Sequence, residues 1–454
     1  MANPTAVRPD ATDRTPSRRT GRWIDHWEPE DPAFWASTGK RVARRNLILS
    51  IFAEHLGFSV WVIWSIVAVN LNSVGFAFTE SQLFWLVAIP NLVGATLRLP
   101  YTFAVPKFGG RNWTIVSALV LVVPCVALAF AVSDPGTSFG TMLFVAALAG
   151  VGGGNFASSM TNISYFYPEK DKGWALGLNA AGGNIGVAVV QAPFVVSAVV
   201  TAGAGIHLAR AGWMWVPLAL LSAFLAWRYM DNLAVARTDF GSSVVAAKRL
   251  HTWVMSFLYI GTFGSFIGYA AAFPLLIKGQ FPEVNVTTYA FLGALVGSLV
   301  RPIGGRLADR VGGGVVTAAS FLAMGLGVLG VVGALRVGSF ALFLACFMVL
   351  FLATGVGNGS TYRMIPAIFR HGVDPADAAA TATMKRQAAA AIGIISAVGA
   401  YGGFLVPRTY GWSTSAFGSI EPALFVYVGI YVVMIVVTWW FYLRRSTEMA
   451  KAGV

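Results

Sequence analysis

Negative charge is scarce in this sequence, and nearly all of it lies outside the apolar segments. Charged residues make up only 11% of the 454 positions, whereas hydrophobic residues make up 56%. This composition excludes an ordinary soluble domain and is typical of a protein embedded in a lipid bilayer. Of the 19 acidic residues, only Glu54 falls inside an apolar segment. A positive charge buried in these segments would therefore find few partners within the chain.

Cysteine is equally rare, with two residues in the whole chain. Cys125 and Cys346 lie far apart in apolar segments, so we interpret them as small core residues without a redox role. The sequence contains no cluster of Cys and His at metal-ligand spacing and no nucleophile–base set within or between the apolar segments. We therefore expect neither an enzyme, nor a metal, nor a cofactor.

Apolar segments of about 20 residues, each long enough to cross a bilayer as a helix, recur along the chain. The sequence predicts twelve spans, an all-α integral membrane protein, and a division into two six-helix bundles. We expect a partly disordered tail at 1–45, the first bundle at 46–230, a linker at 231–251, the second bundle at 252–443 and a second tail at 444–454. The expected spans begin near Leu47, Gln82, Trp113, Thr141, Ala175, Gly212, Trp253, Thr288, Gly314, Phe340, Arg386 and Ala423.

The net charge of +13 is distributed unevenly between the segments that connect the spans. The two tails and the even-numbered loops carry 26 of the 32 Lys and Arg residues, and the odd-numbered loops carry 4. By the positive-inside rule, both termini and the even-numbered loops are cytoplasmic. The basic excess is thus explained by topology, and a nucleic-acid partner is not expected.

Before the first span, residues 1–21 are expected to be disordered, and residues 23–45 form either an interfacial segment or a solvated tail.

Two arginines, Arg98 and Arg301, interrupt otherwise apolar spans. An arginine at membrane depth costs at least about 2.5 kcal/mol on insertion scales, and a guanidinium group does not lose its charge. The two residues are 203 positions apart, and the same shift places Gly109-Gly110 on Gly312-Gly313 and Asn155 on Asn358. Two halves of six helices each, repeated in the same orientation, are the pattern of the twelve-helix major facilitator fold. In that fold the site lies between the halves near the bilayer midplane.

The loop at 304–313, GGRLADRVGG, resembles the signature loop between spans 8 and 9 of the major facilitator superfamily. In that fold this loop connects two helices at the cytoplasmic side. The corresponding loop in the first half, PKFGGR at 106–111, lacks the acidic residue. We therefore expect the conformational latch of the first half to be altered or absent.

Three segments resemble the nitrate/nitrite porter family: GGNFASSMTNIS at 153–164, GVGNGSTYRMIP at 355–366, and the N-terminal run WEPEDPAFW at 27–35. The resemblance extends from about Trp23 to the last span. It implies a transporter of the bacterial cytoplasmic membrane whose partners are nitrate, nitrite as a second candidate, protons and the lipid bilayer, and which functions as a monomer. The motif residues carried over are Gly153, Gly154, Asn155, Ser158, Asn162, Gly357, Asn358 and Ser360.

The resemblance also implies an anion site. In the family, one arginine from span 2 and one from span 8 hold a planar anion, and the matching residues are Arg98 and Arg301. A span 5 asparagine and span 7 aromatic residues enclose the anion there, which corresponds to Asn179, Tyr259 and Phe263. From the residues alone, Asn179 is equally compatible with a packing role, and an aromatic pair at i, i+4 is often packing.

The physical properties of the guanidinium group agree with this substrate class. Nitrate is a small planar anion, and guanidinium is planar and donates two parallel hydrogen bonds, which an ammonium group does not. The alternative is that both arginines cap helix ends or extend to the membrane surface, because each lies within about 10 Å of a helix end by helical rise.

Glu54 and the adjacent His55 are the candidates for proton coupling, because a buried carboxyl group can load and release a proton. Neighbouring helical residues point about 100° apart, so we do not expect both to face one cavity. The alternative is a structural pair with a neighbouring helix or with Arg44 or Arg45. In the family, an acidic residue here resembles the nitrate/proton symporters. The sequence therefore predicts nitrate/proton symport by alternating access, with nitrate/nitrite exchange at the same site as the alternative.

Overall fold

The computed structural model describes residues 18–19, 22–201, 203, 205–236, 240–374 and 377–451. Twelve of its helical segments are long and apolar enough to cross a membrane, which confirms the predicted architecture. Most begin within a few residues of the predicted positions. The first is longer than expected and begins at Pro32 rather than Leu47. Most of residues 1–21, for which disorder was predicted, lie outside the described residues.

The first six spans form one half of the bundle. Several are continuous, whereas others are divided by a residue or two into consecutive helices. In chain order this half comprises α1 (Pro32–Phe34), the π-helical turn η1 (Trp35–Gly39), α2 (Lys40–Trp61), α3 (Trp64–Leu71), the 3-10 turn η2 (Asn72–Val74), α4 (Glu80–Phe108), α5 (Gly110–Val120), α6 (Val122–Ala131), α7 (Phe139–Leu148), α8 (Val151–Phe166), α9 (Glu169–Gln191), α10 (Pro193–Val195), the π-helical turn η3 (Val196–Val200), α11 (Leu208–Trp213) and α12 (Trp215–Tyr229).

The last six spans form the second half. They are preceded by α13 (Phe240–Lys248), which lies in the predicted linker. The half comprises α14 (Leu250–Tyr259), the π-helical turn η4 (Ile260–Gly264), α15 (Ser265–Gln280), α16 (Val286–Val311), α17 (Gly313–Val337), α18 (Phe340–Arg370), α19 (Ala378–Ala400), α20 (Gly402–Phe417), α21 (Glu421–Thr438) and the π-helical turn η5 (Trp439–Leu443), and it is followed by α22 (Glu448–Lys451).

The repeat predicted from the 203-residue shift is visible in the backbone. Helix α4 ends at Gly109 with φ 89°, and helix α16 ends at Gly312 with φ 93°. Only glycine adopts this left-handed region readily, so each half requires a glycine where the second of its spans turns into the third. The two halves therefore share the same turn, and each has a glycine at the equivalent position.

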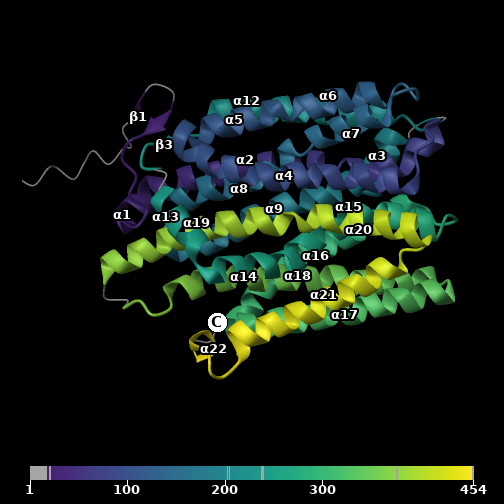
Figure 1. Cartoon of the computed structure of the whole chain (residues 1–454). Helices are drawn as coiled ribbons and strands as arrows, with labels where there is room; N and C mark the ends of the chain where they lie inside the picture. The colour runs from purple at the N-terminus through teal and green to yellow at the C-terminus, as the bar shows by residue number, and fades with distance from the viewer. Residues whose placement is uncertain are drawn as a thin grey trace, which may run out of the picture.

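The two halves lie side by side, with the purple-to-teal helices of the first half above the green and yellow helices of the second in Figure 1. Helix α4 contacts α19 and α20, and α9 contacts α16 across the boundary. Near one end the rings of Phe84 and Tyr410 lie 6.0 Å apart, and near the other Lys385 Nζ lies 3.8 Å from a carboxylate oxygen of Glu169. The space between the halves is thus bounded by contacts near both ends.

The segment before the first span packs on the bundle instead of extending along the membrane or into solvent. Strands β1 (Arg18–Arg19), β2 (Trp23–Ile24) and β3 (Asn232–Leu233) form a small sheet at the end where α22 also lies (Figure 1). Strand β2 pairs in parallel with β3, so the start of the chain is joined to the segment after α12. Trp27 is 5% exposed and donates from Nε1 to the carbonyl of Tyr165, 3.1 Å away.

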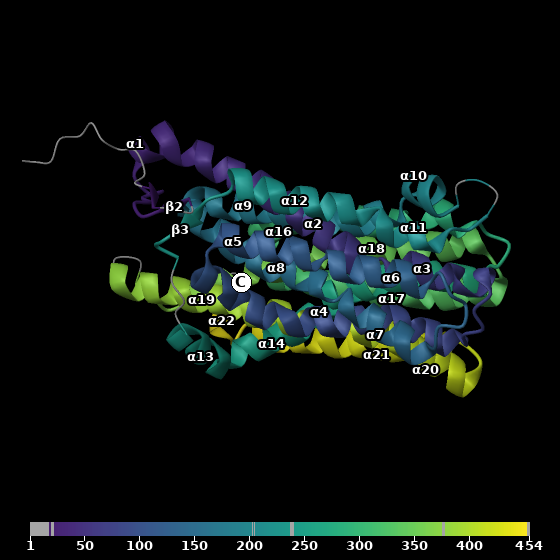
Figure 2. The ribbon, with the colours of Figure 1, turned by 90° about the horizontal axis from the view of Figure 1, so that it is seen from above.

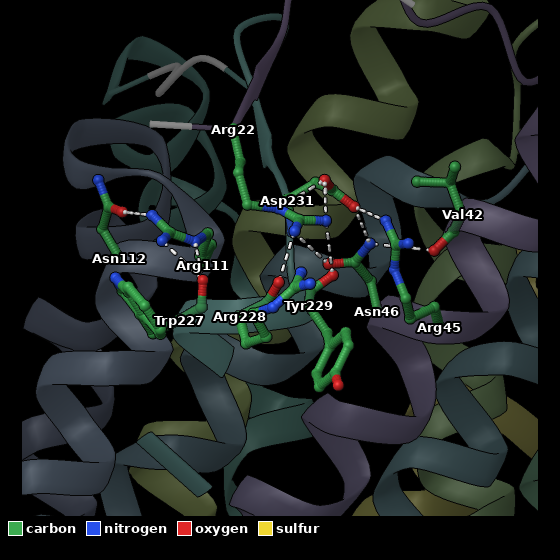
Figure 3. Close-up of polar contacts among 10 residues, drawn as sticks. All are labelled: Arg22, Val42, Arg45, Asn46, Arg111, Asn112, Trp227, Arg228, Tyr229 and Asp231. Carbon is green, nitrogen blue, oxygen red and sulfur yellow. Dashed lines mark hydrogen bonds and ion pairs between the residues drawn. The ribbon is translucent and has the colours of Figure 1, made fainter. Parts of the chain in front are cut away.

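A fully buried carboxylate, Asp231, holds this arrangement together (Figure 3). Arg22 donates to Asp231 at 3.1 Å and to the carbonyl of Tyr229, also at 3.1 Å, which caps the end of α12. Arg45 of α2 forms an ion pair with the other oxygen of Asp231, and Asn46 donates to it at 3.1 Å. One carboxylate therefore joins the N-terminal segment, α2 and α12.

The same region replaces the latch residue that the first half lacks. Arg111, in the first turn of α5, donates from Nη2 to the carbonyl of Trp227 at 2.7 Å. Asn232 accepts from the backbone amide of Asn112 at 3.3 Å. In the second half, by contrast, Asp309 of the signature loop pairs with Arg363 of α18. The contacts at this turn therefore differ between the halves: the first half uses the carbonyl of Trp227 near the end of α12, and the second uses an ion pair.

We expect Asp231→Asn to release the N-terminal segment from the bundle. The change removes the charge that Arg22 and Arg45 share, and a hydrogen bond to a charged group contributes about 1.5–3 kcal/mol. Hydrogen exchange over residues 22–35 should rise roughly 10-fold or more, while exchange in the central helices stays unchanged. Asp134→Asn, in a turn at the opposite end of the bundle, is the control. Equal protection in both variants would show that Asp231 does not hold the segment.

Candidate functional site

Arg98 of α4 is completely buried, and its guanidinium group lies between the two halves. Nε donates to the carbonyl of Gly153 at 3.2 Å, within the first half. Nη1 crosses to the second half and donates to the carbonyl of Ser396 at 3.1 Å and to its hydroxyl at 2.8 Å. Nη2 has no hydrogen-bond partner. The arginine thus bridges α8 and α19 while keeping one nitrogen unused.

Arg301, the corresponding residue of α16, is 6% exposed. Its Nη2 lies 3.4 Å from the hydroxyl of Tyr259, and its Nη1 has no partner. Neither arginine reaches the protein surface, so the alternative in which both extend to the membrane boundary does not apply. An unpaired buried donor is costly, and here each arginine presents one.

Aromatic rings surround the two guanidinium groups. The guanidinium carbon of Arg98 lies 4.6 Å from the ring centre of Phe156 and 4.8 Å from that of Phe263. Arg301 lies 5.8 Å from the same Phe156 ring and 5.4 Å from the ring of Tyr362. Among the described residues, Phe156 is therefore the ring that faces both arginines. Because an aromatic face attracts a cation, these rings stabilise the positive charge in a water-poor site.

The predicted pair of span 7 aromatics lies in this shell. The rings of Tyr259 and Phe263 are stacked, with centres 5.4 Å apart and an interplanar angle of 15°. Phe263 lies within the π-helical turn η4, and Tyr259 directly precedes it. Gly399 of α19 packs so closely on Tyr259 that an added Cβ would approach its ring to 2.3 Å. Single π-helical turns within helices occur frequently at functional sites. The structure thus brings Arg98, Arg301, Tyr259 and Phe263 together.

Glu54 of α2 is fully buried and is connected to Asn179 of α9. Its Oε2 accepts from Asn179 Nδ2 at 2.7 Å, and the same amide nitrogen donates to Ser159 Oγ at 2.7 Å. Oε1 has no partner. The carboxylate also interacts electrostatically with both Arg98 and Arg301. Asn179, predicted as an anion ligand, therefore uses both of its N–H donors on other side chains in this conformation.

His55 has a different environment, as the helical geometry predicted. Its Nδ1 lies 3.2 Å from the carbonyl of Gly182, which ties α2 to α9. No contact joins the imidazole to either arginine among the hydrogen bonds of the described residues. His55 therefore holds two helices together, and Glu54 alone of the pair is connected to the arginines.

The signature-motif glycines make room for side chains of neighbouring helices. An added Cβ at Gly153 would lie 2.6 Å from Trp61 and one at Gly154 2.8 Å from Tyr101, whereas Ser158 donates to the carbonyl of Asn155 at 3.1 Å. In the second half, Ser360 donates to the carbonyl of Gly313 at 2.8 Å. Gly357 packs on Thr262. Each of Asn155, Asn162 and Asn358 has at least one buried side-chain nitrogen or oxygen without a hydrogen-bond partner.

Four residues of the site were missed from the sequence: Trp61, Phe156, Tyr362 and Ser396. Phe156 and Tyr362 lie inside the motif runs at 153–164 and 355–366 that carry the family resemblance, so their aromatic character was the available signal. Trp61 lies 5.4 Å from the guanidinium carbon of Arg98. Ser396 carries no local signal, because only the packing of α19 on α4 brings it to Arg98.

This chain is similar to known proteins over most of its length. The model of the Major Facilitator Superfamily matches residues 47–384. The nitrate/nitrite transporter NarU of Escherichia coli is 44% identical over 92% of this chain and 96% of its own length. The probable nitrate/nitrite antiporter NarK2 of Thermus thermophilus is 37% identical over 94% of this chain and 98% of its own. This chain belongs to the nitrate/nitrite porters of the Major Facilitator Superfamily.

The porter is accordingly a multi-pass membrane transporter and not an enzyme. Its fold is similar to that of a crystallised D-xylose–proton symporter, with a TM-score of 0.64 at 16% identity, over 90% of this chain and 98% of the other. At that identity the similarity concerns the fold alone. The described residues of the porter contain no group of three or more His, Cys, Asp or Glu side chains that could hold a metal ion.

Proposed function

We propose that this porter carries nitrate across the cytoplasmic membrane of a bacterium by alternating access, coupled to protons. The observation that carries the proposal is the pair of buried arginines, each with one guanidinium nitrogen that has no partner. Two positive charges and one buried carboxylate leave the site with a net positive charge. A planar monoanion that accepts hydrogen bonds supplies the missing charge and the missing acceptors.

The arginines belong to different halves, which suits alternating access. An anion held by Arg98 and Arg301 would draw α4 and α16 together. Arg98 donates to Ser396 of the opposite half. Nitrate bound at the same guanidinium group would compete with this contact, so that binding changes the interaction between the halves.

Proton coupling is proposed because of Glu54. An inside-negative potential opposes anion entry by about 2.3 kcal/mol per 100 mV, so uptake requires a co-transported cation or an exchanged anion. Glu54 is the buried carboxylate that interacts with both arginines. The second candidate is electroneutral nitrate/nitrite exchange, which the name of the Thermus relative favours. By the positive-inside rule, both termini are proposed to be cytoplasmic.

The test is nitrate influx into proteoliposomes, with and without an inward proton gradient. Accumulation driven by the gradient, with no nitrite inside, is expected for a symporter. Influx only after loading nitrite inside would replace symport by exchange while keeping the anion site. Absence of both in folded protein would contradict nitrate as the substrate.

We expect Gly183→Ala to impair coupling through Glu54. An added Cβ at Gly183 would lie 2.2 Å from Glu54 Oε1, so the carboxylate must move. Proton-driven influx should fall roughly 10-fold or more, by analogy with displacement of a catalytic group by about 1 Å. Gly177→Ala on the same helix is the matched control, because nothing lies within 4 Å of its added Cβ. Equal influx in both variants would contradict a role for the position of the Glu54 carboxylate.

A further inference from the structure

Four basic side chains on the first two turns of α2 line an open pocket that the transport site does not use. Lys40, Arg41, Arg44 and Arg45 line this pocket of about 560 Å³, together with apolar residues of α2 and Tyr229, the last residue of α12. Both helices belong to the first half. The pocket therefore lies on the flank of that half and not between the two halves.

The residues around the pocket are typical of a membrane boundary. Figure 2 shows the start of the first helical segment at the edge of the bundle, and α2 contacts α12. The apolar part of α2 starts directly after the basic residues, and Ile48 in the pocket wall is 53% exposed. Tyr229 is 42% exposed, and tyrosine is enriched where a membrane meets water. The pocket thus has a cationic part at headgroup level and an apolar part that continues into the bilayer.

The charge in the pocket is largely uncompensated. Lys40, Arg41 and Arg44 are exposed, and none has a carboxylate within 4 Å among the ion pairs of the described residues. Only Arg45 has a partner, Asp231, which also holds the pocket together by joining α2 to the end of α12 (Figure 3). Like charges one helical turn apart destabilise a helix by about 0.2–0.5 kcal/mol per pair. An anion in the pocket would remove this repulsion.

We propose that this pocket binds the phosphate of an anionic phospholipid headgroup. Guanidinium groups bind phosphate oxygens through paired hydrogen bonds, and basic pockets at membrane-facing helix ends bind anionic headgroups. A free phosphate ion shares this chemistry, but it does not use the apolar wall formed around Ile48. The lipid would bridge α2 and α12 on the surface of the bundle, close to where the buried Asp231 joins the same two helices.

The test uses the full-length protein in detergent, titrated with phosphatidylglycerol or phosphatidylcholine, with bound lipids counted by native mass spectrometry. We expect retention of phosphatidylglycerol over phosphatidylcholine and at least about a tenfold loss of its affinity in Arg41→Gln/Arg44→Gln. Arg444→Gln/Arg445→Gln is the matched control, because it removes two exposed arginines at the same end of the bundle. The control should bind as the unaltered protein does.

Three outcomes would overturn the proposal. The first is an equal loss of affinity in both double variants, which would show a general effect of net charge. The second is equal binding of the two lipids by the unaltered protein. The third is displacement of phosphatidylglycerol by inorganic phosphate at equal concentration, which would assign the pocket to a soluble phosphate. Nitrate binding, measured in parallel, should be the same in all variants, because the pocket and the arginine pair are separate.

Discussion

Arg98→Lys should abolish high-affinity nitrate binding even though the positive charge is retained. Lysine keeps one compact cation but loses the planar fork that donates to Gly153, to Ser396 and through the free Nη2. A hydrogen bond to a charged group contributes about 1.5–3 kcal/mol, so nitrate affinity should fall roughly 10- to 150-fold. The same change at Arg301 should have a similar effect, because its free Nη1 is the counterpart in the other half. The measurement is nitrate binding by calorimetry on purified protein.

The matched control for this result is Arg336→Lys. Arg336 is an exposed arginine in an ion pair with Glu421, so the exchange has the same chemistry outside the site. Its nitrate affinity should be unchanged. Because a buried change can affect folding, each variant is first compared by its melting temperature. Normal nitrate affinity in folded Arg98→Lys would exclude the arginine pair as the anion site.

The features that could be predicted from the sequence are those with a repeated or local pattern. Twelve apolar segments predicted twelve spans, and the turn at Gly109 and Gly312 followed from the shift between the halves. The arginines were conspicuous because a charge in an apolar segment is rare. Each of these signals is present within a short stretch of chain or repeats at a fixed distance.

The features that could not be predicted depend on contacts between distant segments. Asp231 lies in a stretch that is polar in sequence, and its burial arises from Arg22, 209 residues away. Likewise, the family resemblance assigned Asn179 to the anion site. Its use of both donors on Glu54 and Ser159 depends on how α2, α8 and α9 pack. Helical periodicity predicts the face of the helix on which a residue lies, but not which side chain of a neighbouring helix it contacts.

Glu54→Gln should separate nitrate binding from proton coupling. Glutamine keeps the volume of the side chain and accepts from Asn179, but it does not bind a proton in this range. Proton-driven nitrate accumulation should therefore fall to the level of protein-free vesicles, while nitrate counterflow without a gradient continues. Glu80→Gln, an exposed carboxylate at the start of α4, is the control and should retain both activities. Loss of counterflow together with accumulation would indicate damage to the anion site instead.

The same variant tests how the coupling works. An ionised Glu54 competes with nitrate for the charge of Arg98 and Arg301, with which it interacts. A proton on the carboxylate removes this competition, so proton and nitrate should each strengthen the binding of the other, by the same factor. Nitrate affinity of the unaltered protein should then increase as the pH falls, whereas that of Glu54→Gln should be high and independent of pH. A variant with the pH dependence of the unaltered protein would return Glu54 to a structural role, because the coupling would have to arise from another group.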